Sequence, residues 1–213
     1  MRNNVVTIIG KVKSYENNEG IIAVERFSGN ADLIPFRTLR PCSISAGQRY
    51  CLEGILCTQN VWDDNLVMHK NTYIGVRSAY RTLVLGDKND INIVGYLCKL
   101  GAVRSTPLSN RIIQDLIVAV NTEDPTTSYY PSCIAWGQYT IEKLKTIRMG
   151  TKVHIQGRFQ SRQYKKGDEL KTAYEISLRN IRIIPDEPLC EGWYEGDCEA
   201  CSMTECMNYR GRK

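Results

Sequence analysis

The clearest pattern in this 213-residue chain is an alternation of apolar and polar side chains over residues 153–164. Successive side chains of a strand point to opposite faces, so the alternation predicts a strand with one buried face. The face expected to be buried carries Val153, Ile155, Gly157 and Phe159. The opposite face carries His154, Gln156, Arg158, Gln160, Arg162 and Tyr164. Lys165-Lys166-Gly167-Asp168 favours a hairpin turn, and we expect the return strand over residues 171–184.

Three more strands are expected upstream, over residues 91–100, 112–121 and 129–137. Before the fourth strand, Thr140 can cap a short helix in which Ile141, Leu144 and Ile147 share one face. Five strands with a helix between the third and the fourth is the order of an OB-fold. This small, partly open barrel binds oligonucleotides across its face.

The first third of the chain repeats this pattern. Residues 6–12 align with residues 91–97, and residues 47–54 align with residues 150–157. An internal repeat of this length predicts a second barrel. Its strands are expected over residues 5–13, 21–27, 31–38, 48–59 and 67–78. The third and fourth of these strands are joined by residues 39–46, which are too few for a proper helix.

The predicted fold class is therefore all-β, with two tandem five-stranded OB-fold barrels, a short helix in the second barrel and a Cys-rich C-terminal tail. The first domain would span residues 1–84 and a polar linker residues 85–89. The second domain would span residues 90–185 and the tail residues 186–213. Two domains of about a hundred residues each are natural for this length.

Charge is unevenly distributed among these parts. The net charge of +5 is made up of +3 over residues 1–89, +6 over residues 90–184 and −4 over residues 185–213. The second predicted domain therefore holds most of the positive charge. A moderate positive charge suits binding to nucleic acid that depends on salt.

Aromatic side chains accompany these cations. Tyr130, Trp136 and Tyr164 lie on expected strands, interleaved with Arg158, Arg162, Lys165 and Lys166. Rings can stack on any base and cations can neutralise any phosphate, so this pattern is typical of a site for single-stranded nucleic acid. The corresponding hairpin of the first repeat carries Trp62. Alternatively, Trp136 and Tyr174 are ordinary core aromatics, and the cations are a solvated sheet edge.

Four separated blocks of the second domain resemble the bacterial single-stranded DNA-binding protein family. They are Asn92-Ile93-Val94-Gly95-Tyr96-Leu97, Leu116-Ile117-Val118-Ala119-Val120-Asn121, Cys133-Ile134-Ala135-Trp136-Gly137 and Ile155-Gln156-Gly157-Arg158-Phe159-Gln160-Ser161-Arg162. The resemblance implies binding of single-stranded DNA without sequence preference in replication, recombination or repair, with no required cofactor. It also implies that Tyr130, Trp136 and Tyr164 stack on bases.

The resemblance further implies four OB domains per working unit, which a two-domain chain would reach as a homodimer. The strand at residues 91–100 or its counterpart at residues 5–13 offers an edge for such pairing. Replication or recombination proteins are expected partners. Two alternatives stay open: an adaptor that docks replisome, primosome or mobile-element proteins, and a protein that binds single-stranded RNA.

Four cysteines, Cys190, Cys198, Cys201 and Cys206, are clustered in the tail. Four thiolates can hold a structural zinc ion, and the two-residue spacing between Cys198 and Cys201 suits a shared site. The alternative is a set of reduced cysteines. The tail is also net acidic, so it could compete with nucleic acid for a cationic face.

Other classes of function have little support in the sequence. A deaminase needs His-x-Glu with Pro-Cys-x-x-Cys, whereas the chain has His154-Ile155-Gln156 and Asp197-Cys198. A phosphate-binding glycine loop and a His-Glu-x-x-His motif are both missing from the sequence. We therefore expect no enzyme. The sequence carries no secretory signal and no apolar stretch of membrane-spanning length, so the expected location is the cytoplasm, in association with the nucleoid.

Overall fold

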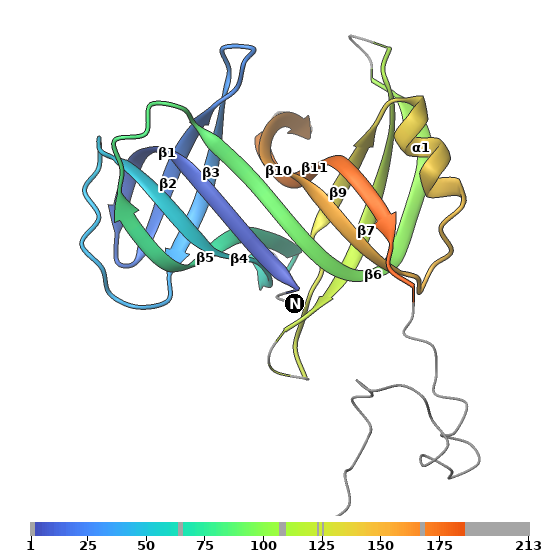
Figure 1. Ribbon diagram of the computed structural model, residues 1–213, viewed down its shortest axis with the longest axis horizontal. Coiled ribbons are helices and arrows are strands. Elements are labelled where there is room, and N and C mark those ends of the chain that lie inside the picture. The colour runs from blue at the N-terminus through green and yellow to red at the C-terminus, as the bar shows by residue number, and fades with distance from the viewer. Residues whose placement is uncertain are drawn as a thin grey trace, which may run out of the picture.

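The computed structural model describes residues 3–63, 66–106, 110–122, 124, 126–166 and 169–185. The side chains of residues 165, 166, 169 and 170 lie outside that description. The strands are β1 (Asn4–Glu16), β2 (Glu19–Glu25), β3 (Ala31–Thr38), β4 (Arg49–Trp62), β5 (Met68–Arg81), β6 (Lys88–Ser105), β7 (Ile112–Asn121), β8 (Ser128–Tyr129), β9 (Ser132–Trp136), β10 (Lys152–Lys166) and β11 (Glu169–Ile183). One helix, α1 (Gln138–Lys145), lies among these residues (Figure 1).

Strand pairing closes two rings of five strands. In the N-terminal ring, formed by β1 to β5, the order β2-β3-β5-β4-β1 returns to β2 because β1 also pairs with β2. In the C-terminal ring, β6-β10-β11-β9-β7 returns to β6 because β6 pairs with β7. Both rings have one parallel pair, β3 with β5 and β9 with β11. The fold is therefore mostly β, with closed five-stranded rings.

Glycines recur at equivalent places in the two rings. A Cβ at Gly10 would overlap the carbonyl oxygen of Ala23, and a Cβ at Gly95 would overlap that of Ala119. In β1 and β6 these glycines precede the register shifts where each strand bends across its neighbour. The repeat at residues 6–12 and 91–97 thus includes positions where the backbones of crossing strands come too close for a side chain.

The core follows the alternation expected from the sequence. Val153, Ile155 and Phe159 are fully buried, as are Ile8 and Leu52 in the N-terminal ring. The opposite face of β10 and β11 differs from expectation, because the polar side chains of Gln160, Glu175 and Ser177 are also buried. They lie between the two rings, where β10 meets β3.

The helix begins earlier than predicted, so the assignment of Thr140 as its cap was wrong. Its N-cap is Gly137, whose φ of 78° is a left-handed conformation that favours glycine, and the cap has no side-chain hydrogen bond. Thr140 lies inside the first turn. Ile141 and Leu144 face the core as expected, and Ile147 is buried just beyond the helix end.

The two rings are joined by backbone pairing between β1 and β6. Asn4 is opposite Ile93, and the register continues to Ile9 opposite Lys88. β6 begins at Lys88, so this pairing reaches into the segment expected to be a linker. The two edges that we expected to pair between chains therefore pair with each other inside one chain.

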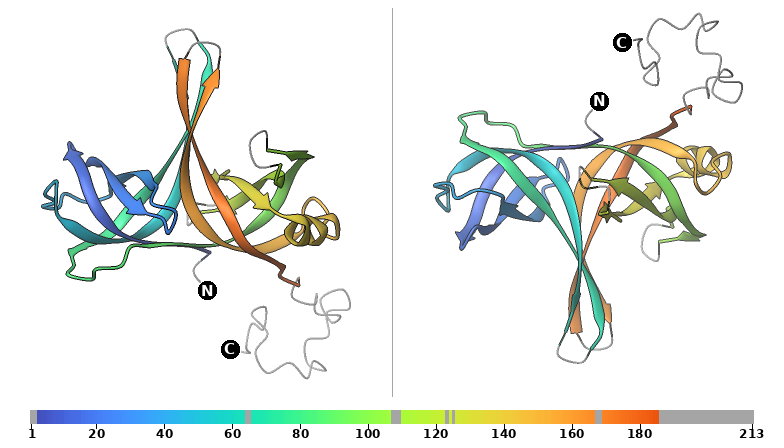
Figure 2. Two further views of the ribbon diagram at one scale, coloured as in Figure 1. Left: turned by 90° about the horizontal axis from the view of Figure 1, so that it is seen from above. Right: turned by 90° about the horizontal axis from the view of Figure 1, so that it is seen from below.

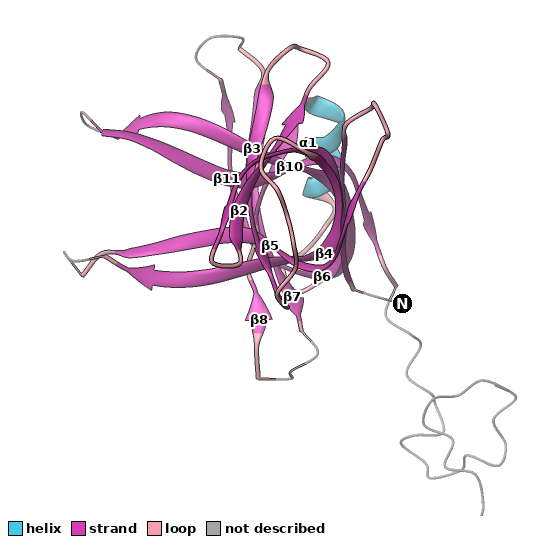
Figure 3. Ribbon diagram, turned by 90° about the vertical axis from the view of Figure 1, so that its left-hand side faces the viewer, coloured by secondary structure: helices cyan, strands magenta, loops and turns pink. Residues whose placement is uncertain are grey.

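Two long hairpins extend beyond the rings. The β4–β5 hairpin is paired out to Trp62 opposite Met68, and the β10–β11 hairpin out to Lys166 opposite Glu169. We call them the two arms. They project to the same side of the molecule, one from each ring (Figure 2 and Figure 3).

Candidate nucleic-acid interface

A cleft of about 510 Å³ lies beside β10, between the two rings. Trp136 at the end of β9 lines it together with four arginines: Arg26, Arg111, Arg158 and Arg162. Arg26 follows β2 in the N-terminal ring, whereas the other four residues belong to the C-terminal ring. We call this site the cationic cleft. Both rings contribute cations to it.

A buried carboxylate ties the two rings together beside the cleft. The Asp32 side chain is 1 % exposed and accepts hydrogen bonds from Arg26, from Arg158 Nη1 at 2.8 Å and from the backbone N–H of Ser161 at 3.0 Å. The carboxylate raises the pKa of Arg26, whereas burial and the Arg26 charge lower the pKa of Arg158. Arginine side chains stay protonated in proteins, so both groups remain charged.

A second buried carboxylate, Glu175, lies on β11. Its Oε1 accepts a hydrogen bond from Gln160 Nε2 at 2.7 Å and lies 3.4 Å from Arg162 Nε. Three of the four guanidinium groups pair with these two carboxylates, so among the described residues the four arginines keep an excess of two positive charges. An excess of this sign attracts a phosphate backbone.

Trp136 brings an aromatic ring and an unused donor to the cleft. The residue is half-buried, and its indole nitrogen is buried without a hydrogen-bond partner in the described part of the chain. An indole N–H is a donor only, and leaving it unpaired costs free energy. The ring of Trp136, and not its buried N–H, is therefore the part of this residue that a ligand in the cleft can contact.

Tyr164 extends the site along the β10–β11 arm. Its side chain is 38 % exposed, and the Arg162 guanidinium lies 5.6 Å from its ring centroid. Lys165 and Lys166 continue the backbone pairing of β10, opposite Leu170 and Glu169. The structure thus brings Trp136, Arg158 and Arg162 together in the cleft, with Tyr164 two residues beyond.

Tyr130 and Trp62 belong to a different part of the surface. The backbone N–H of Tyr130 donates to Thr58 Oγ1 at 2.8 Å, and its carbonyl accepts from Lys70 Nζ at 2.9 Å. These contacts hold the Tyr130 backbone against the β4–β5 arm. Trp62, at the end of β4, is 63 % exposed. Tyr130 is 46 % exposed. The aromatic side chains of Tyr130 and Trp62 are therefore both open to solvent.

The strand expected over residues 129–137 is interrupted in this region. The structure has β8 and β9 instead, with Tyr130 and Pro131 between them. Proline has no N–H to give to a sheet ladder, which accounts for the break. The break leaves the Tyr130 N–H free to bond across to the N-terminal ring.

Sequence reasoning missed Arg26, Asp32 and Arg111 as parts of the site. Arg26 and Asp32 come from the first repeat, and no local pattern connects them with β10. One signal was present: Asp32 falls on the same face of β3 as the buried residues Ile34 and Phe36. A carboxylate on a core face needs a cationic or hydrogen-bonding partner.

The cysteines proposed as zinc ligands, Cys190, Cys198, Cys201 and Cys206, lie outside the described residues. Within those residues, no group of three or more His, Cys, Asp or Glu side chains is placed to hold a metal ion. The one helix in the described ranges is too short to cross a membrane.

Comparison with known proteins matches the second half of the chain to a family. Residues 88–184 fit the model of the single-strand binding protein family. No curated protein matches the chain. The resemblance inferred from four sequence blocks is therefore confirmed for the part of the chain that forms the C-terminal ring.

Solved structures extend the likeness in fold to both rings. The wild-type single-stranded DNA binding protein from Thermus aquaticus is 17 % identical, with a TM-score of 0.63 over 87 % of this chain and 95 % of that one. A deletion mutant of the same Thermus aquaticus protein is 16 % identical, with a TM-score of 0.64 over 88 % of this chain and 97 % of that one. At this identity the likeness concerns the fold.

Proposed function

We propose, from the family match of residues 88–184 and the geometry of the cleft, that this protein binds single-stranded DNA without sequence preference. In doing so it would protect exposed strands during replication, recombination or repair. The observation that carries the proposal is the cationic cleft, which is lined by Trp136 and four arginines. Stacking and phosphate contacts act on any base, so no sequence preference follows from them.

Each ring is proposed to be an OB-fold domain. The first domain spans residues 1–84 and the second residues 90–185, joined at residues 85–89. The common strand order of the two rings supports this division. The role is one of binding, without catalysis, and it takes place in the cytoplasm with the nucleoid.

The strand is proposed to follow the cleft and then the two arms. Trp136, Tyr164, Tyr130 and Trp62 supply stacking rings, of which the last three are exposed. Arg158, Arg162, Lys165 and Lys166 supply charge. Arg158 differs from Arg162 in the closeness of its pairing, because its guanidinium lies 2.8 Å from the buried Asp32, whereas that of Arg162 lies 3.4 Å from Glu175. Arg158 therefore holds the two rings together at the cleft and also adds positive potential there.

Two chains are proposed to form the working unit, with replication or recombination proteins as further partners. Family resemblance implies four OB domains per unit. Because β1 and β6 pair inside the chain, the contact between chains has to use other surfaces.

A structural zinc ion is proposed for the tail, held by Cys190, Cys198, Cys201 and Cys206. Metal analysis of protein purified under reducing conditions should then give close to one zinc per chain. A value near zero would assign these cysteines to the reduced form. DNA binding does not depend on this metal in the proposal.

Competition binding tests the main proposal. Labelled poly-dT is displaced by unlabelled poly-dT, poly-rU and duplex DNA at two salt concentrations. We expect poly-dT to compete best and duplex DNA to compete poorly, because paired bases cannot stack on the rings. Equal competition by poly-rU would indicate a general single-strand binder, and strong competition by duplex DNA would contradict the proposal.

A further inference from the structure

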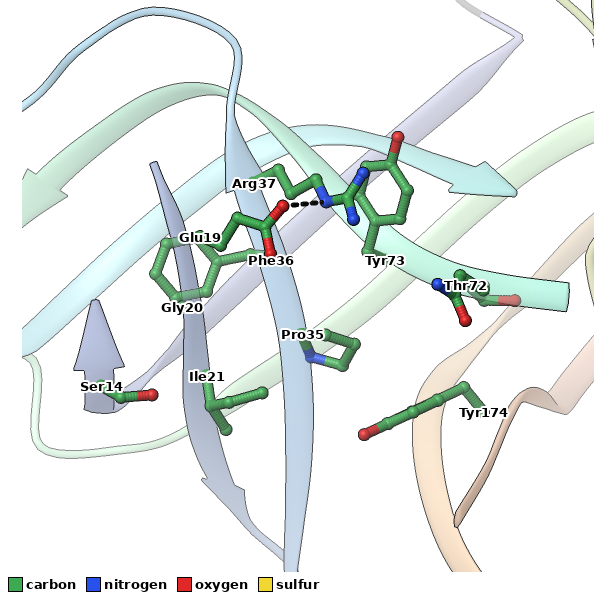
Figure 4. Close-up of a pocket in the computed structure, with 11 residues that line it drawn as sticks. Ser14, Glu19, Gly20, Ile21, Pro35, Phe36, Arg37, Thr72, Tyr73 and Tyr174 are labelled. Atoms are coloured by element: carbon green, nitrogen blue, oxygen red, sulfur yellow. Dashed lines mark ion pairs between the residues drawn. The ribbon is translucent and has the colours of Figure 1, made fainter. Parts of the chain in front are cut away.

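A second cavity, of about 370 Å³, lies where β11 of the C-terminal ring faces β2, β3 and β5 of the N-terminal ring (Figure 4). Its lining includes Glu19, Pro35, Arg37, Tyr73 and Tyr174. Only Tyr174 among these comes from the C-terminal ring. We call it the inter-ring pocket. It is complete only when the two rings are docked.

The pocket contains a flat platform that the surrounding residues hold in place. The Arg37 guanidinium lies 4.4 Å from the centroid of the Tyr73 ring. Arg37 Nε pairs with Glu19 at 2.9 Å, and its Nη1 donates to Gln59 Oε1 at 3.2 Å. A guanidinium fixed on a tyrosine ring is a surface on which planar groups stack.

Tyr174 supplies a second aromatic side chain to the pocket. It packs against the buried Phe159 with ring centroids 6.0 Å apart, so the core of the C-terminal ring supports it. Burial raises the pKa of its hydroxyl, which therefore stays protonated and neutral. Figure 4 shows Tyr174 near Pro35, on the side of the pocket away from Ser14.

The charges of the pocket favour a base over a phosphate. Arg37 is balanced by Glu19, whereas the cationic cleft holds two positive charges in excess. A carboxylate repels phosphate but accepts hydrogen bonds from the N–H groups of bases, including the ring N–H of thymine. Pocket and cleft both border β11, since Tyr174 lines the former and Ser177, three residues further along the strand, lines the latter.

We propose that the inter-ring pocket receives one unpaired base of a DNA strand whose phosphates lie in the cationic cleft. The base stacks on the platform of Arg37 and Tyr73 and contacts Tyr174. The strand therefore passes from one ring to the other at this point. This inference rests on the proposed function and adds a site on the N-terminal ring.

Binding measurements with dT oligonucleotides of increasing length test the inference in the full chain. Tyr73→Ala should weaken binding of long oligonucleotides by about 5- to 150-fold, the usual loss for one stacked base. Tyr73→Phe should bind like the wild type, because stacking does not need the hydroxyl. Tyr139→Ala is the matched control, since Tyr139 also has a cation, Lys143 Nζ at 4.5 Å, over an exposed ring outside the pocket.

Photocrosslinking gives a measurement on the unaltered protein. Oligo-dT that carries 5-iodouracil is irradiated in the complex, and adducts are mapped by mass spectrometry. Adducts on Tyr73 or Tyr174 support the inference. Wild-type affinity in a folded Tyr73→Ala protein, without adducts on either tyrosine, would overturn it while leaving the proposed function intact. Failure of the wild-type chain to bind any single strand would overturn the proposed function first.

Discussion

At the scale of single residues, Trp136 offers a DNA strand an aromatic ring at the edge of the cationic cleft. Trp136→Ala should weaken binding to poly-dT by about 1–3 kcal/mol, the usual loss per stacked base. Trp136→Phe keeps a smaller aromatic ring, so it should lose only part of that amount. Anisotropy of labelled oligo-dT measures both affinities, and the quenching of tryptophan fluorescence by poly-dT should decrease in Trp136→Phe, with Trp62 as a remaining source of quenching. Unchanged affinity in a folded Trp136→Ala protein would remove this residue from the site.

Asp32 has a structural part in the same cleft. Asp32→Asn leaves Arg26 and Arg158 without their carboxylate and should lower the free energy of unfolding by about 1–3 kcal/mol. Asp115→Asn is the matched control, because its pair with Arg104 is exposed, with 48 % accessibility on each side. Urea unfolding measures the difference. Equal losses in the two variants would mean that the buried pairs do not stabilise the fold.

The sequence could indicate that Asp32 is unusual, but it could not indicate the partner. The alternation of β3 places this carboxylate among core positions. Arg158 is 126 residues away, in the other ring. Pairing at that distance depends on how the rings dock, and no local periodicity encodes it. For the same reason Arg37 and Tyr73 could not be linked with Tyr174.

At the scale of elements, the C-terminal end of β10 should set the salt dependence of binding. Changing Arg162, Lys165 and Lys166 together to Gln should make the slope of log affinity against log salt shallower, by about 0.7 for each phosphate that the protein no longer neutralises. Arg158→Gln should change the slope less, because Asp32 already neutralises that charge. Titrations at several salt concentrations give the slopes. An unchanged slope in the triple variant would place the phosphate contacts on another element.

The outer face of β10 also carries a titratable group. Burial and the neighbouring Arg182 lower the pKa of His154 below its ordinary value of 6.5. The unfolded chain then binds a proton more readily than the folded one, so stability is full above pH 6.5 and falls as the pH drops towards the folded-state pKa. Thermal melts on both sides of pH 6.5 should show a smaller acid-induced decrease in His154→Gln than in the wild type. An equal decrease in both would assign the acid sensitivity to other groups.

Strand periodicity was a good guide to the elements, and local backbone chemistry explains where it failed. Residues 31–38 and 112–121 form strands with the predicted limits. The strand near Tyr130 is broken by Pro131, and the helix begins at Gly137 because that residue adopts a positive φ. Both exceptions depend on single residues whose backbone differs from the rest. Periodicity averages over such positions.

At the scale of the whole molecule, the contact between the rings was the feature that the sequence left open. Strands β1 and β6 each present an apolar alternation, so both were expected to offer an edge. The structure pairs them with each other, and the backbone N–H of Val94 donates to the Asn3 carbonyl at 2.7 Å. One chain therefore already contains a paired set of two rings. That pairing removes the simplest route to assembly between chains.

The number of chains in the working unit can be tested directly. If four OB domains are needed for tight binding, light scattering should give twice the chain mass of 24.3 kDa at micromolar concentration, with one strand bound per two chains. The contact should survive changes confined to β1 and β6 edges, because those edges are already paired within the chain. A monomer that binds poly-dT tightly would show that two rings suffice. The cleft, the inter-ring pocket and the two arms would then form the complete binding path on a single chain.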